Sequence, residues 1–194
     1  MLINGFRNIS HKLEFVVQSD WKCHIPLKLR EGYYHASSYD KLLDAPLVAG
    51  NLTSQYFYVN NIKHQLICIG EPPRGWPKNF LKDISLVCEA DCKLFNEDPP
   101  SGADYILVIQ LLDDCYGGLE HENSAVLQYD WRALAKKNGY RRLLQLIAHE
   151  YLHQWNVKRL RPKEYIQYNY NKAIISDSLW FAEGVTSYFD LAIP

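Results

Sequence analysis

The sequence has 194 residues, enough for a domain with a core of its own. Hydrophobic residues make up 47% and charged residues 22%, which is ordinary for a soluble globular protein. Lys and Arg number 21 against 22 Asp and Glu, so the charge gives no reason to expect a nucleic acid or an anionic membrane as the main partner. No apolar run is long enough to span a bilayer, and we expect no membrane span.

The cysteine content points to a reducing compartment. An odd number of cysteines cannot all pair within one chain, so we expect reduced side chains at Cys23, Cys68, Cys88, Cys92 and Cys115. Cys88 and Cys92 lie one helical turn apart, but no second Cys or His pair follows at zinc-finger spacing. The N-terminus lacks the apolar region of a signal peptide. Together these features predict a cytoplasmic location.

The first half of the sequence predicts strands and one helix. Up to about residue 70, turn-forming residues separate several short runs rich in β-formers: His11–Val17, Cys23–Arg30, Ser54–Asn60 and His64–Gly70. A loop with three prolines, 71–77, precedes a predicted helix from Asn79 to Asn96. A second proline-containing loop, 97–104, leads into the continuous apolar run 105–112, which is typical of a buried strand.

The second half predicts two further helices. From Asn138 the apolar residues recur at spacings of three and four, as in an amphipathic helix. We expect the basic run 158–163 to mark its end, complementing the helix dipole, and Pro162 to close it. The last segment, Ser178–Ala192, is predicted to be a helix that opens at a Ser or Asp cap. The fold class expected is α+β.

The first of these helices contains the pattern H-E-x-x-H at His149, Glu150 and His153. Residues four apart lie on one helix face, so both imidazoles can reach the same metal ion. The apolar stripe through Leu144 and Ile147 points into the core and leaves the histidines facing a cleft. Glu150 can take a proton from a water molecule at the metal. The alternative is a pair of surface histidines without a metal.

An open catalytic zinc site needs a third protein ligand. Glu183 is the best candidate, because it lies near the start of the next predicted helix, between Trp180-Phe181-Ala182 and Gly184-Val185. A carboxylate in such apolar surroundings is costly to bury unless it binds a cation or pairs. An exposed helical glutamate is the alternative.

Two adjacent glycines, Gly117 and Gly118, follow the predicted buried strand. They indicate a backbone that another group approaches closely. The alternation after them predicts an edge strand that can pair with an extended peptide, while Glu120 can hold a free α-ammonium group. A β-bulge with an exposed acid is the alternative.

Three sequences together, GGLEH (117–121), HEYLHQWNVKRLRP (149–162) and LWFAEGVTSYF (179–189), closely resemble the glycyl aminopeptidase family of zinc peptidases. That family belongs to the thermolysin-like gluzincins, and many members carry a PDZ-like domain. The resemblance begins near 33–50 and covers most of the chain. It implies that residues 1–32 end an N-terminal β domain and that residues 33–194 form a thermolysin-like catalytic domain, incomplete after its second active-site helix.

The resemblance also implies roles for individual residues. The ligands of one zinc ion would be His149, His153 and Glu183. The substrate-binding residues would be Glu120, Gly117, Gly118 and His121. Glu150 would be the general base.

The implied activity is removal of N-terminal residues, often small ones such as Gly or Ala, from a peptide substrate. In relatives a donor that stabilises the oxyanion comes from the region beyond this chain, and nothing assigns that role to Tyr168 or Tyr170. If Glu120 does not anchor the N-terminus, the same core would serve a zinc endopeptidase. The remaining alternative is a truncated peptide-binding module without turnover. The sequence does not predict an oligomeric state.

Overall fold

The computed structural model describes residues 5–102 and 105–194, so the end of the expected loop 97–104 lies outside the described residues. The chain divides into two compact units, Met1–Thr53 and Ser54–Pro194. The expected boundary between residues 32 and 33 falls inside the hairpin that pairs β3 (Lys28–Arg30) with β4 (Tyr33–Ala36). The assignment of residues 33–194 to one catalytic domain stays a prediction.

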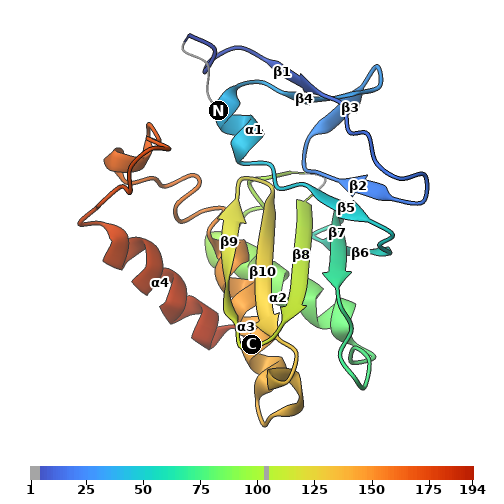
Figure 1. Ribbon diagram of the computed structural model, residues 1–194. Coiled ribbons are helices and arrows are strands. Elements are labelled where there is room, and N and C mark those ends of the chain that lie inside the picture. The colour runs from blue at the N-terminus through green and yellow to red at the C-terminus, as the bar shows by residue number, and fades with distance from the viewer. Residues whose placement is uncertain (1–4, 103–104) are drawn as a thin grey trace. The chain divides into compact units, whose positions relative to one another are not determined.

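The first unit consists of short antiparallel strand pairs and a short helix (Figure 1). Strand β4 pairs with β1 and β3, and β2 pairs with β5. The predicted run Cys23–Arg30 is two strands, because Pro26 lies between them and has no backbone N–H to donate. The elements are β1 (His11–Leu13), β2 (Lys22–His24), β3 (Lys28–Arg30), β4 (Tyr33–Ala36), α1 (Tyr39–Leu43) and β5 (Val48–Gly50).

The second unit contains a mixed five-stranded sheet in the order β6-β7-β8-β10-β9. Strands β7, β8 and β10 run parallel in the centre, while β6 and β9 are antiparallel edge strands. The buried strand and the edge strand predicted from the sequence are confirmed as β8 and β9. The strands are β6 (Ser54–Val59), β7 (Ile62–Ile69), β8 (Tyr105–Leu112), β9 (Tyr116–His121) and β10 (Ser124–Asp130).

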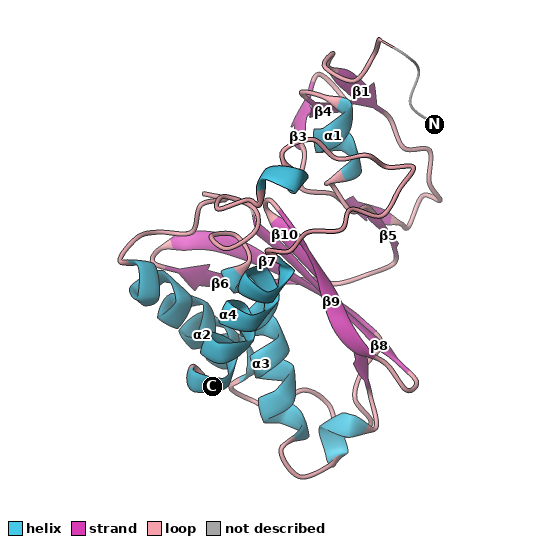
Figure 2. Cartoon of the chain, turned by 90° about the vertical axis from the view of Figure 1, so that its left-hand side faces the viewer, coloured by secondary structure: helices cyan, strands magenta, loops and turns pink. Residues whose placement is uncertain are grey.

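Helices α2 (Phe80–Phe95) and α3 (Gly139–Leu152) pack against the sheet and against each other, and α4 (Leu179–Ala192) packs against α3 (Figure 2). Short 3-10 turns lie at Ala133–Ala135 and Lys163–Tyr165. Ser178 precedes α4 but makes no side-chain capping hydrogen bond. The mixed α+β fold is confirmed. Within the described ranges, no helix has the length and apolar character to cross a membrane.

The core of this unit lies between the sheet and helices α2 and α3. Its largest side chains include Tyr105, Tyr129 and Tyr151. His64 is buried among them and bonds the Tyr151 hydroxyl at 2.8 Å, and burial lowers the pKa of His64 to about 4. All five cysteines are free, as expected.

Helix α3 ends earlier than the sequence predicted. Its last residue is Leu152, well before Pro162. Val157 has a φ of 98°, which a right-handed helix does not allow, and the chain turns back on itself there. The basic run therefore does not follow the helix end, and the expectation that it complements the helix dipole was wrong. Arg159 forms an ion pair with Glu97 instead.

Candidate metal centre

The two histidines of the H-E-x-x-H pattern share one face of α3, as predicted. His149 lies in the last helical turn and His153 is the C-cap residue, with ring centroids 4.7 Å apart. The opposite face is buried in the core through Leu143, Ile147 and Tyr151. The helix thus holds both imidazoles on a backbone fixed by packing.

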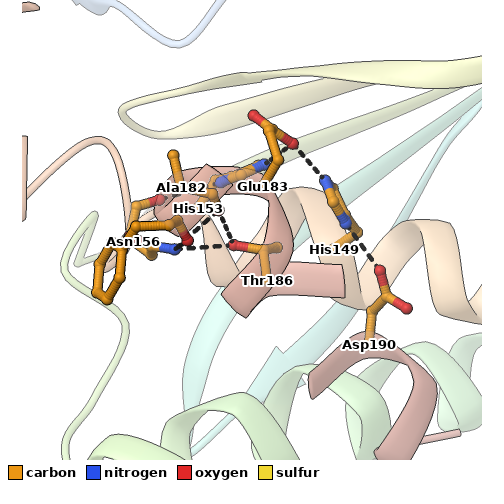
Figure 3. Close-up of polar contacts among 8 residues, drawn as sticks. His149, His153, Asn156, Ala182, Glu183, Thr186 and Asp190 are labelled. Atoms are coloured by element: carbon orange, nitrogen blue, oxygen red, sulfur yellow. Dashed lines mark hydrogen bonds and ion pairs between the residues drawn. The ribbon is translucent and has the colours of Figure 1, made fainter. Parts of the chain in front are cut away.

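Helix α4 brings Glu183 to these imidazoles. Its Oε2 atom lies 3.3 Å from Nε2 of His149 and 3.7 Å from Nε2 of His153 (Figure 3). The side chain of Glu183 is 51% exposed, whereas that of His153 is 2% exposed. The group is therefore open to solvent on the side of the carboxylate. Side chains of these three residues could hold a metal ion, since their ligand atoms lie within 4.8 Å of one another.

Each imidazole is oriented through its other nitrogen. Nδ1 of His149 donates to Oδ2 of Asp190 at 2.7 Å, and Nδ1 of His153 donates to the backbone carbonyl of Asn156 at 3.0 Å. A carbonyl oxygen can only accept, so the hydrogen of neutral His153 is on Nδ1 and the Nε2 lone pair faces Glu183. Such hydrogen bonds fix the tautomer and orientation of metal-binding histidines.

This donor set fits zinc. Two imidazole nitrogens and one carboxylate oxygen, with a fourth position open, are the usual ligands of a catalytic zinc ion. Around a tetrahedral ion with bonds of about 2.0–2.2 Å, neighbouring ligand atoms lie roughly 3.3–3.5 Å apart. The distances of 3.3 and 3.7 Å from Glu183 to the two histidines are close to that spacing.

The ionisable groups of the site shift one another's pKa values. Burial lowers the pKa of His149, but its hydrogen bonds with Asp190 and Glu183 outweigh burial and raise the pKa to about 10. The bond with His149 lowers the pKa of Glu183. Burial lowers the pKa of His153. At neutral pH His149 is therefore an imidazolium paired with two carboxylates, and a metal ion bound at Nε2 would displace that proton and take over its positive charge.

Glu150 lies between α3 and the edge strand β9. A second group of possible metal ligands joins it with Glu120 and His153, again with ligand atoms within 4.8 Å of one another. Gly118 makes room for it, because a Cβ at that position would lie 2.6 Å from Cγ of Glu150. Of the two glycines at which a close approach was predicted, Gly118 is therefore approached by this side chain. Burial, together with the charges of Glu120 and Glu183, raises the pKa of Glu150 to about 8, although the charge of His149 acts in the opposite direction.

Two predicted residues do not join these groups. His121 follows Glu120 in β9, so its side chain faces the opposite side of the sheet, where it is buried. A Cβ at Gly117 would meet nothing within 4 Å. The substrate-binding roles of these residues and of Glu120 and Gly118 stay predictions. Tyr168 and Tyr170 stack on each other, and the structure assigns them no role.

The sequence reasoning missed three residues that hold or surround the ligands. Asp190 carried a usable signal, since it lies two helical turns after Glu183 and hence on the same face of α4. Asn156 carried no such signal, because its contacts join separate segments. Asp91 of α2 is buried, and its carboxylate oxygens have no hydrogen-bond partner among the described residues. Burial raises the pKa of Asp91 well above its usual value, and the charge of Asp190 raises it further.

Comparison with known proteins shows what the chain is similar to. The profile of the M61 glycyl aminopeptidase family matches residues 142–194, the segment with both histidines, Glu150 and Glu183. The crystal structure of an aminopeptidase N family protein from Idiomarina loihiensis is 31% identical over 96% of this chain, with a TM-score of 0.84. The C-terminal part of the chain is thus similar to the glycyl aminopeptidase family. The chain spans about a third of the length of the Idiomarina loihiensis protein, covering 34%.

A more distant structure shares the fold of this chain. A two-domain M1 zinc metallopeptidase, solved as a mutant bound to L-arginine, is 14% identical over 89% of this chain and 37% of its own, with a TM-score of 0.52. Among curated proteins no sequence matches the chain. The comparisons therefore show the fold of the chain and a match to a peptidase family over residues 142–194.

The contact between Gly118 and Glu150 can be tested by stability. Gly118→Ala is expected to destabilise the protein by about 1–3 kcal/mol, because the added methyl group overlaps Glu150. The free energy of unfolding would be measured by urea denaturation with tryptophan fluorescence. Gly184→Ala is the matched control, since a Cβ there meets nothing within 4 Å and alanine favours helix.

A double variant identifies the contact that causes the loss of stability in Gly118→Ala. In a Glu150→Ala background, Gly118→Ala should lose most of its effect, because the overlapping side chain is gone. An equal loss in both backgrounds would show that Glu150 is not the group that Gly118 accommodates.

Proposed function

We propose that this chain provides the zinc-binding and proton-transfer residues of an aminopeptidase. The observation that carries the proposal is the convergence of His149, His153 and Glu183, with both imidazoles oriented by acceptors at Nδ1. The placement of Glu120 and Glu150 beside this group supports it. The match of residues 142–194 to the glycyl aminopeptidase family agrees with this chemistry.

His149, His153 and Glu183 would hold the zinc ion, one per chain. When bound, the ion polarises the scissile carbonyl and lowers the pKa of water at its open position. Glu150 takes the proton from the attacking water and passes it to the leaving amine. Its position beside His153, in a space that only a glycine at position 118 leaves free, restricts the directions in which its carboxylate can point.

Glu120 and the edge strand would bind the substrate. The outer edge of β9 has no strand beyond it in the described sheet, so its backbone can pair with an extended peptide. The Glu120 carboxylate lies within 4.8 Å of a ligand atom of His153, and an α-ammonium held there lies close to the reacting carbonyl. Only a short N-terminal stretch fits between the two groups, which favours an aminopeptidase over an endopeptidase.

Zinc content tests the metal site directly. The purified chain is expected to retain about one zinc ion after dialysis, and Glu183→Ala is expected to retain much less, because two histidines alone bind zinc weakly. Atomic absorption would measure the metal, with Glu14→Ala as the control for loss of an exposed glutamate. A folded wild-type chain without zinc affinity would contradict the proposal.

Glu150→Gln separates an enzyme from a peptide-binding module. The amide cannot accept the proton, so turnover should fall by at least about 10²-fold while zinc content stays unchanged. Peptide hydrolysis would be followed by release of a free amine, alongside zinc content. Zinc-loaded wild-type chain that binds peptide without hydrolysing it would favour the binding module.

A blocked peptide tests the role of Glu120. The wild type is expected to cleave a free tripeptide with N-terminal Gly or Ala and to lose nearly all activity on its N-acetylated form, which has no α-ammonium. Glu120→Gln should lose activity on the free peptide and most of this discrimination. Equal cleavage of both peptides by the wild type would indicate an endopeptidase.

A further inference from the structure

We propose that the Asn156 side chain is a positioning residue for the third metal ligand. It fastens α4 to the end of α3, and so sets how firmly Glu183 is held beside the two histidines. This inference rests on the zinc site proposed above. It concerns a residue outside the ligand set, and it predicts a change in metal affinity with an unchanged pair of histidines.

The amide of Asn156 donates to the turn of α4 that carries Glu183. Its Nδ2 atom lies 2.9 Å from the carbonyl oxygen of Ala182 and 3.0 Å from Oγ1 of Thr186, with the carbonyl of Phe181 at 3.4 Å (Figure 3). Asn156 is buried, so these bonds form where no water replaces them. Since Ala182 precedes Glu183 directly, the bonds fix the backbone next to the ligand.

Besides the hydrogen bond between Asp190 and His149, helix α4 has little other attachment within the described chain. Its fully buried residues are Ala182 and Thr186, and both are bonded by the Asn156 amide. Its large apolar side chains, such as Trp180 and Tyr188, are exposed. Burial of apolar surface therefore contributes little to docking this helix, and the hydrogen bonds carry a correspondingly larger share.

The backbone of Asn156 orients a second proposed metal ligand, His153. Its carbonyl accepts from Nδ1 of His153. Substitution of the side chain leaves this carbonyl in place. A change of side chain should therefore loosen Glu183 on α4 while the orientation of His153 is kept, which separates the two contributions of one residue.

The experiment measures metal affinity of the full chain with Co²⁺ and with Zn²⁺ in competition with a chelator. Asn156→Asp keeps the size but replaces the donor by an acceptor, and the affinity is expected to fall about 10–100-fold. The visible spectrum of bound Co²⁺ should change with the loss of a ligand. Gln154→Glu is the matched control, because Gln154 is equally buried but bonds Ser101 and the Tyr151 carbonyl.

A double-mutant cycle with Glu183→Ala identifies the route. If Asn156 acts through Glu183, Asn156→Asp should have almost no further effect on affinity once Glu183 is removed. An equal loss in both backgrounds, or a loss of the same size in Gln154→Glu, would overturn the inference. If Asn156→Asp does not fold, Asn156→Ser removes the amide without adding charge and takes its place in the cycle.

The two proposals fail in different ways. A wild-type chain that binds neither metal contradicts the zinc site itself. A wild-type chain that binds metal normally, with folded Asn156 variants that bind it equally well, leaves the zinc site in place and overturns only the role of Asn156.

Discussion

The site depends on a set of hydrogen bonds that join two helices far apart in sequence. Buried imidazoles and carboxylates are stable only where partners replace the lost water. Here Asp190 and the Asn156 carbonyl are those partners for His149 and His153. Asp190 lies on α4, so the bond that orients His149 and the bonds that bring Glu183 to the histidines form together, whereas the bond that orients His153 is local to the end of α3.

Helix α3 has two faces with different physical roles. Its apolar face packs under the sheet, where even the polar atoms of Tyr151 and His64 bond each other. Its other face presents His149 and Glu150 to β9 and α4. Because close packing fixes the apolar face, the spacing of the histidines is rigid, whereas the position of Glu183 depends on how α4 is docked. The metal affinity of the proposed site would therefore depend mainly on how firmly α4 is docked.

Local sequence patterns predicted the elements that one helix or strand determines alone. The apolar run of β8, helix α2 and the shared face of the histidines all follow from periodicity, and these predictions are confirmed. The predicted end of α3 was wrong, because the positive φ of Val157 depends on contacts that no local pattern encodes. The hydrogen bonds of Asn156 cross to α4, 25 or more residues away, so no spacing rule could find them. Asp190 was within reach of such a rule and was overlooked.

Edge strand β9 and the proposed metal site have complementary roles in positioning a peptide. Pairing with an edge strand fixes the direction of a peptide backbone but not its register, since every second residue offers the same hydrogen bonds. A charged anchor at the end of the strand removes that freedom, and in β9 the only carboxylate is Glu120. Gly118, one pleat earlier on the same face, leaves the space that Glu150 fills. In the proposed enzyme, two alternate positions of one strand would thus set both the register of the peptide and the place of the base that acts on it.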